Sequence, residues 1–271
     1  MSGIDHATPG ICILLCFAGL LLLRELRRVR AGYQHSIRRI PGVDAIEGAV
    51  GRCAEQGRAV SFTTALTDVG PTLVACIGVL QAVVKKVAQY KLKLFVPQYS
   101  PEAMAVVEDS VQAAYSQVGK ASQFDPSSIV FLSSEQFAFA SGYMGLLHRE
   151  KPGAAFLFGA FAAESLVLSE AGQQVGARQV AASVSPEQVA FFICTCDYTL
   201  IGEELFGASA YLGRDAVQVA TLAAQDRFKL LIGSIIVLGV ICATVAACLP
   251  SLQLIKPVEF LAAGWERLYS R

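Results

Sequence analysis

The chain has 271 residues, of which 54% are hydrophobic and 16% are charged, and its formal net charge is zero. An average soluble domain has about 25% charged residues, so this sequence is poor in charge. A chain without net charge has no overall field to attract nucleic acid, and we therefore expect no nucleic-acid partner.

The first element is the apolar run 11–23, which reaches the length of a membrane span if Pro9, Gly10 and the stem of Arg24 are included. A bilayer core of about 30 Å needs roughly 20 helical residues. Cleaved signal peptides carry basic residues before the apolar run, whereas here they all follow it: Arg24, Arg27, Arg28, Arg30, Arg38 and Arg39. Because basic flanks stay in the cytoplasm, residues 1–25 are predicted to form an uncleaved anchor with its N-terminus outside.

Residues 26–58 are predicted to form a basic juxtamembrane segment against anionic headgroups, ending in a helix over 43–56. Residues 59–213 then alternate apolar strand patterns with helices, which is typical of βαβ units and a parallel sheet. The sequence predicts an α/β fold, a Rossmann-like layer of about six strands whose order stays open. The predicted strands are 59–65, 92–99, 128–133, 154–160, 179–184 and 198–202.

A second apolar run, 230–249, carries no charge, and no turn residue separates it from the preceding helix that begins near Arg214. Residues 214–249 are therefore predicted to be a stalk helix that continues into a transmembrane helix. Residues 250–271 place Trp265 and several aliphatic residues on one helical face, which favours an interfacial helix or a helix that packs on a partner. Together these elements predict a two-pass protein of the cell inner (plasma) membrane with a cytoplasmic central domain.

Polar and acidic side chains follow each predicted strand. In open parallel sheets, ligands bind beyond the carboxyl ends of the strands, near the point where strand order reverses. Helix caps and first-turn acids explain the same residues equally well, so both interpretations stay open. The candidate ligand-binding residues are Thr63, Thr64, Ser133, Ser134, Glu135, Glu164, Glu203 and Glu204.

Several common signatures of chemistry are missing from the sequence. The turn after the first strand reads ALTDVGPT and contains no GxGxxG fingerprint or phosphate loop, and no GxSxG elbow occurs. His6, His35 and His148 have no partner at metal-ligand spacing, and Cys194 and Cys196 are separated by a single residue. We therefore expect no dinucleotide or zinc cofactor, the cofactor stays unknown, and a function other than catalysis is favoured.

Three segments carry a family resemblance: VDAIEGAVGRCAEQGRAV, the GAFAAE motif at 159–164 and the GEELF motif at 202–206. They are similar to a family of uncharacterised prokaryotic membrane proteins, a domain of unknown function with a C-terminal transmembrane helix. The similarity covers about residues 42 to 249. It implies the architecture but no catalytic residue, and it draws attention to Arg52, Glu55, Gly57 and Arg58.

Three functions remain open on these grounds. The first is a membrane-tethered binding or assembly module, a homo-oligomer or an accessory subunit of a membrane complex. The second is a sensor that binds a metabolite or nucleotide at the carboxyl ends of the strands. The third is an enzyme that uses the carboxylates, with oxygen ligands suited to Mg²⁺ or Ca²⁺.

Overall fold

The computed structural model describes residues 9–31, 33, 40–213 and 216–248. The chain divides into two compact units, a helical unit and an α/β unit, and the second covers residues 36–215. The predicted interfacial helix at 250–271 and the residues that join the stalk to the domain, 214–215, lie outside the described residues.

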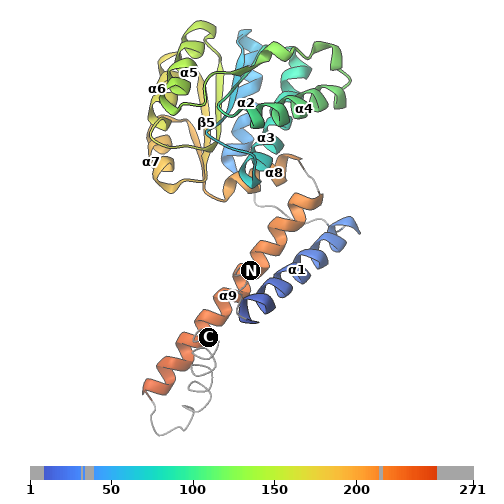
Figure 1. Cartoon of the computed structure of the whole chain (residues 1–271), viewed down its shortest axis with the longest axis vertical. Helices are drawn as coiled ribbons and strands as arrows, with labels where there is room; N and C mark the ends of the chain where they lie inside the picture. Colours follow the sequence, from blue (N-terminus) through green and yellow to red (C-terminus); the bar gives the residue numbers. More distant parts are fainter. Residues whose placement is uncertain (1–8, 32, 34–39, 214–215, 249–271) are drawn as a thin grey trace, which may run out of the picture. The chain divides into compact units, whose positions relative to one another are not determined.

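The α/β unit alternates helices and strands as expected (Figure 1). Its strands are β1 (Val60–Ala65), β2 (Leu94–Gln98), β3 (Ile129–Phe131), β4 (Ala154–Ala160), β5 (Arg178–Ser183) and β6 (Tyr198–Ile201). Its helices are α2 (Pro41–Gln56), α3 (Pro71–Tyr90), α4 (Pro101–Gln117), α5 (Gln136–Glu150), α6 (Ser165–Gln174), α7 (Pro186–Thr195) and α8 (Glu204–Gly213), with short 3-10 turns at Ala121–Gln123 and Pro126–Ser128.

Proline at the first helical position defines several of these starts, because its fixed φ suits a helix and its missing N–H needs no partner there. Pro71, Pro101 and Pro186 all stand at this position. At Pro101 the preceding Ser100 also caps the helix by accepting a hydrogen bond from the Ala103 N–H. These local signals fix where the three helices begin.

The six strands form one parallel sheet in the order β3-β2-β1-β4-β5-β6. This confirms the predicted Rossmann-like parallel layer and adds the strand order. Order reverses between β1 and β4, which pair from Val60 opposite Ala154 to Ala65 opposite Ala160. The switch point of the fold therefore lies at the carboxyl ends of these two strands.

Helices cover both faces of the sheet (Figure 1). One face packs against α2, α3, α4 and α8 through an apolar cluster in which Phe62 and Phe158 stack at 5.5 Å. The other face packs against α5, α6 and α7 through a cluster centred on Phe139, Leu157 and Phe192. Because both faces are covered, the functional surfaces of this unit are the two ends of the strands, hereafter the carboxyl edge and the amino edge.

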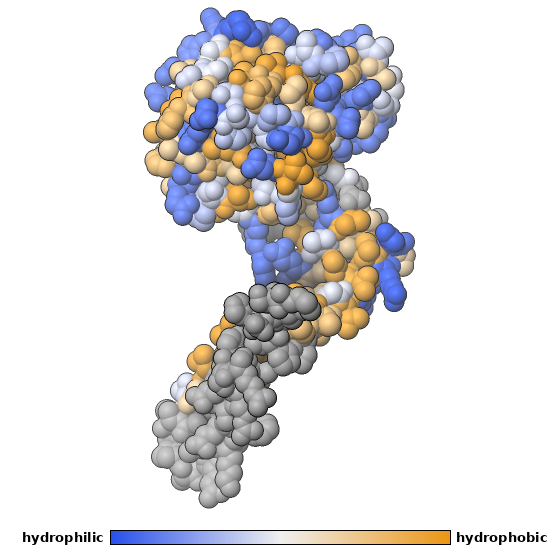
Figure 2. All heavy atoms as spheres, in the orientation of Figure 1, coloured by the Kyte–Doolittle hydropathy of each residue, from blue (hydrophilic) through white to orange (hydrophobic). Residues whose placement is uncertain are grey.

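The helical unit contains α1 (Pro9–Arg30) and α9 (Ala216–Cys248), which run antiparallel and contact each other (Figure 1). Two helices among the described residues are long and apolar enough to cross a membrane, α3 and the segment 216–244 of α9. Helix α3 is a largely buried core helix of the α/β unit, whereas the most apolar window of the α9 segment contains no buried residue. Apolar side chains accordingly dominate the visible described surface of this unit (Figure 2).

A charged pair joins the two helices of this unit. Glu25 of α1 is fully buried and forms an ion pair with Arg227 of α9, and Arg28 lies 3.8 Å from the same carboxylate. Glu25 stands just after the apolar run of α1, and Arg227 stands just before that of α9. A buried ion pair demands a defined geometry, so the two apolar runs start from the same level and extend to the same side of the pair.

Candidate functional site

The switch point, where this fold commonly binds ligands, is closed by hydrogen bonds between the two loops that flank it. The Leu66 N–H donates to the Ala160 carbonyl at 3.1 Å, and the Ala160 N–H donates to Thr67 Oγ1 at 2.8 Å. The Thr67 hydroxyl in turn donates to the Thr64 carbonyl. The backbone and hydroxyl groups that could meet a ligand here are bonded to each other instead.

Gly159 makes this closure possible. Its φ is +143°, a conformation that L side chains rarely adopt, and a Cβ at this position would lie 2.3 Å from Thr67 Oγ1 and 2.4 Å from the Thr64 carbonyl oxygen. Only glycine lets the end of β4 approach the turn after β1 this closely. The first residue of the GAFAAE motif thus has a structural role.

Thr63 and Thr64, at the end of β1, are fully buried and point into the neighbouring strand end. Thr63 donates to the Pro97 carbonyl at 3.0 Å, and Thr64 donates to Gln98 Oε1 at 2.8 Å. The Gln98 amide is buried, and its Nε2 has no acceptor among the described residues. The two threonines therefore tie β1 to β2, and one buried amide donor remains beside them.

The structure brings Glu164 to the first turn of α5. Glu164 is fully buried, and its two oxygens accept from Gln136 Nε2 at 2.6 Å and from the Ala162 N–H at 3.0 Å. This joins the N-termini of α5 and α6. A buried carboxylate needs such partners because water is absent, so Glu164 has a structural explanation as well as a predicted ligand-binding one.

The remaining candidates are spread along the same edge. Ser133 accepts a hydrogen bond from the Glu135 N–H at 3.0 Å, while Ser134 and Glu135 are exposed at the start of α5. Glu204 accepts from the Ile201 N–H at 3.0 Å, and Glu203 is exposed beside it. They follow β3 and β6, the two outer strands of the sheet, so the eight candidates do not form a single cluster.

The carboxyl edge as a whole is acidic and partly apolar. Within residues 40–213, the seven acids that lie between a strand end and the first turn of the next helix are Asp68, Glu102, Glu135, Glu164, Glu187, Glu203 and Glu204, and no Lys or Arg lies there. Large apolar side chains are exposed at the same edge: Val69, Phe131, Phe137, Leu166 and Ile201. Acids in a first turn stabilise the helix dipole, but dipole stabilisation does not account for exposed phenylalanine.

The amino edge carries the opposite charge. All ten Lys and Arg residues within 40–213 lie in the last two turns of a helix, between that helix and the next strand, or at the first residue of a strand. They are Arg52, Arg58, Lys85, Lys86, Lys91, Lys93, Lys120, Arg149, Lys151 and Arg178. The α/β unit therefore has one edge without basic residues and another that contains all of them.

Arg58 is fixed at the amino edge by backbone carbonyls that end two helices. Its Nε donates to Lys151 O at 3.0 Å, and its Nη2 donates to Pro152 O and Val175 O, both at 2.9 Å. A longer bond of 3.5 Å reaches Gly176 O. A planar guanidinium can serve several carbonyls at once, so Arg58 holds the ends of α5 and α6 together.

A cleft of about 570 Å³ lies beside Arg58. Arg52, Arg58 and Arg178 line it together with the end of α7. Arg178 donates to Asp197 Oδ1 at 2.6 Å, and Asp197 Oδ2 accepts from the Gln179 N–H at 2.8 Å. The cleft is thus lined by arginines from α2, from the start of β5 and from the chain before β1. One carboxylate, that of Asp197, positions Arg178.

Two thiols near this cleft, those of Cys53 and Cys196, stay uncharged at neutral pH. Burial raises the pKa of Cys53 to about 11 despite the nearby Arg58 and Arg52. Burial likewise raises the pKa of Cys196 to about 12, although a hydrogen bond with Thr195 opposes the shift. Only thiolates are good nucleophiles, so neither group is suited to nucleophilic chemistry.

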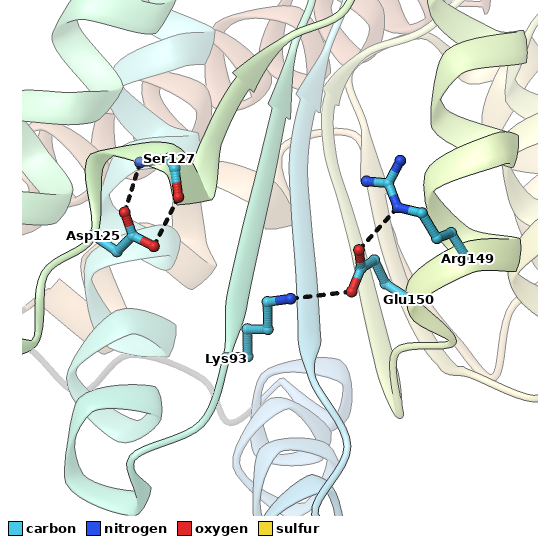
Figure 3. A network of polar contacts seen from close by, with 5 residues as sticks. All are labelled: Lys93, Asp125, Ser127, Arg149 and Glu150. Atoms are coloured by element: carbon cyan, nitrogen blue, oxygen red, sulfur yellow. Dashed lines mark hydrogen bonds and ion pairs between the residues drawn. The ribbon is translucent and has the colours of Figure 1, made fainter.

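A network of surface charges occupies another part of the amino edge (Figure 3). Glu150, at the end of α5, accepts from Arg149 Nε at 2.9 Å and from Lys93 Nζ at 3.2 Å, and these bonds hold the pKa of its carboxyl below the ordinary value. Lys93 also lies over the Phe95 ring at 4.6 Å. Exposed pairs of this kind contribute little to stability, so the network marks the basic edge rather than a site.

Comparison with known families places the chain. The family model described as Domain of unknown function (DUF6754) matches residues 5–253. The protein belongs to this DUF6754 family. No curated protein and no solved structure matches the chain, so the family supplies no activity or ligand for this member.

Sequence reasoning looked for a site only at the carboxyl edge and therefore missed the cleft at the amino edge. The family resemblance draws attention to Arg52 and Arg58, but no motif in the sequence indicates Arg178 or Asp197. One usable signal exists in the sequence: within residues 40–213 no Lys or Arg lies between a strand end and the first turn of the next helix, whereas bases occur at helix ends, between a helix and the next strand, or at the first residue of a strand.

Proposed function

We propose that this DUF6754 protein is a membrane-anchored assembly module that associates with further copies of itself through the carboxyl edge of its α/β unit. The observation that carries the proposal is the chemistry of that edge. Its polar groups at the switch point are bonded within the chain, yet it exposes apolar side chains such as Phe137 and Ile201, which are 64% and 56% exposed. Exposed apolar groups of this size favour contact with another protein surface.

Charge complementarity favours a second copy as the occupant. The carboxyl edge has acids and no bases, and the amino edge has all the bases of residues 40–213. A contact between unlike edges of two copies is heterologous, and it closes into a ring or continues as a filament. Electrostatic steering of this kind would weaken as salt is raised.

The helical unit supports the membrane part of the proposal. The apolar runs of α1 and α9 extend to the same side of the buried Glu25–Arg227 pair, as expected of a hairpin that crosses a bilayer twice. Basic residues follow the apolar run of α1, and this charge pattern supports an α/β unit in the cytoplasm and an N-terminus outside at the plasma membrane.

Orientation can be tested with the exposed Cys194 of the α/β unit. In intact cells, a maleimide that cannot cross membranes should leave Cys194 unmodified, and it should label Cys194 after lysis. A Cys194→Ser variant identifies the labelled position by mass spectrometry. Labelling of Cys194 in intact cells would show that the α/β unit faces outward.

Assembly can be tested by light scattering on the full-length protein in a mild detergent. Wild type should form a defined oligomer whose mass falls at high salt. Phe137→Ser should dissociate it at least tenfold more readily, since removing a buried phenylalanine from an interface costs about 1.5–3 kcal/mol. Phe191→Ser is the matched control, because Phe191 is also exposed but lies on α7.

Two results would reject assembly through this edge. One is a monomer at every protein concentration and salt. The other is an oligomer that Phe191→Ser weakens as much as Phe137→Ser does.

A small-ligand sensor remains a second candidate because of one observation, the buried Gln98 amide whose Nε2 has no acceptor among the described residues. A ligand or water that enters beside Thr64 would supply that acceptor. Gln98→Met tests this second function, because it removes the buried donor and leaves the acids of the carboxyl edge unchanged. Loss of ligand-induced stabilisation with assembly intact supports the sensor, whereas unchanged ligand-induced stabilisation contradicts it.

A further inference from the structure

The cleft at the amino edge is built from the ends of several elements. Its walls come from the last turns of α2, α6 and α7 and from the starts of β4 and β5. At about 570 Å³, its volume lies within the range of small-molecule sites, roughly 300–1,000 Å³. The cleft lies at the amino edge, whereas the switch point lies at the carboxyl edge. It is therefore distinct from the ligand site that the sequence predicts.

Helix C-termini ordinarily repel anions, because their free carbonyls carry partial negative charge. Arg58 removes this obstacle. Its guanidinium lines the cleft and binds the carbonyls of Lys151, Pro152 and Val175, so its positive charge offsets the partial negative charge of these helix ends.

Two further guanidiniums are then available to a ligand. Arg52 is exposed and makes no hydrogen bond or ion pair within the described part of the chain. Arg178 is about one-third exposed, and Asp197 engages only its Nη1. Asp197 is itself held by the Gln179 N–H, so Arg178 is fixed in direction while its other donors remain open.

The charges lining the cleft therefore do not balance. Three guanidiniums face a single carboxylate, Asp197, among the residues that line it. The lining also contains the thiols of Cys194 and Cys196 and the amides of Gln56 and Gln173. Planar guanidiniums recognise phosphate through paired hydrogen bonds and are enriched where phosphate is bound.

We propose that this cleft binds a phosphate ester, with Arg52 and Arg178 as the groups that contact the phosphate and Arg58 as a positioning residue. Two sources share this chemistry, a soluble phosphorylated metabolite and the headgroup of an anionic phospholipid. Both present a phosphate on a small polar body that the cleft can enclose.

The test is calorimetric titration of the full-length protein in a neutral detergent at constant ionic strength. The probes are glycerol 3-phosphate for a soluble phosphate ester and dihexanoyl phosphatidylglycerol for a lipid headgroup. Saturable binding of glycerol 3-phosphate identifies a soluble ligand, and binding of the phosphatidylglycerol alone identifies the lipid. Glycerol and dihexanoyl phosphatidylcholine serve as the uncharged and zwitterionic controls.

Two variants decide whether the cleft is responsible. Arg52→Gln should weaken binding at least tenfold, about 1.4 kcal/mol, and it should leave folding intact because Arg52 is exposed. Arg149→Gln removes a charge from the same edge outside the cleft and should leave the affinity unchanged. The proposal is overturned if neither probe saturates, if Arg52→Gln binds like wild type, or if Arg149→Gln weakens binding as much.

Discussion

The carboxyl edge and the amino edge of the sheet differ in their charge and in how their polar groups are bonded. At the carboxyl edge, hydroxyl, amide and carboxylate groups form hydrogen bonds within the chain, at the switch point and beside it, and acidic and apolar side chains are exposed. At the amino edge, arginines are held by carbonyls and by Asp197 around an open cleft. A Rossmann-like strand order commonly creates a ligand-binding crevice at the switch point. In this protein, hydrogen bonds within the chain close that position, and the open cleft lies at the amino edge.

The largest effect expected at the carboxyl edge comes from Gly159→Ala. The new Cβ would overlap Thr67 Oγ1 and the Thr64 carbonyl, and φ would remain at +143°. We expect a loss of about 3 kcal/mol or more in the free energy of unfolding, since overpacking and backbone strain each cost roughly 1–3 kcal/mol. Chemical denaturation followed by circular dichroism measures the loss.

Gly145→Ala is the control for this prediction. Gly145 lies in α5, and nothing lies within 4 Å of an added Cβ, so this change should stabilise the protein by about 0.5–1 kcal/mol. If Gly159→Ala is equally harmless, the two loops do not touch as described and the switch point is open.

A smaller effect is expected from Arg58 at the amino edge. Arg58→Gln should lower the free energy of unfolding by about 2 kcal/mol, because hydrogen bonds from a charged donor contribute about 1.5–3 kcal/mol. Arg58→Lys should recover little of this, since one ammonium cannot reach carbonyls at Lys151, Pro152 and Val175 together. If Arg58→Lys is as stable as wild type, the positive charge alone stabilises this edge and the several N–H donors of the guanidinium are not required.

The smallest effect is a decline in stability at alkaline pH. Cys53 has a pKa of about 11 in the folded protein and 9.0 as an ordinary thiol. The folded state therefore keeps a proton that the unfolded state loses, and stability falls as pH rises above about 9. Between pH 9 and pH 10 the loss from Cys53 is about 1 kcal/mol.

Cys53→Ala provides the comparison, since it removes the titrating group together with some packing. Its stability at pH 7 should be lower than that of wild type, but its decline between pH 9 and pH 10 should be shallower. An equally steep decline would assign the alkaline sensitivity to other buried groups, such as Tyr143, whose pKa is also raised by burial.

Much of the fold could be predicted from the sequence because its signals are local. Apolar strand patterns and their spacing predicted all six strands to within two residues at either end. Strand order could not be predicted, because it depends on which apolar faces meet at a distance. The pairing of β1 with β4 joins Val60 to Ala154, and nothing near either residue specifies that partner.

The candidate site was harder to predict, for a different reason. The sequence shows that Thr64 and Glu164 follow strands, but it does not show whether their oxygens face solvent or the chain itself. Their bonds to Gln98 and Gln136 are made across elements that lie 34 and 28 residues away. The same applies to Glu25 and Arg227, which join α1 to α9 although they lie at opposite ends of the chain.

The position of β4 in the sheet has a consequence for synthesis on the ribosome. Strands β1, β2 and β3 can pair as soon as they emerge, but one side of β1 stays bare until β4 follows, roughly ninety residues behind it, a delay typical of non-local pairing. During that interval an apolar strand presents unpaired N–H and C=O groups to its surroundings. The bond from the Ala160 N–H to Thr67, which closes the switch point, therefore cannot form until roughly ninety residues after Thr67 have been synthesised.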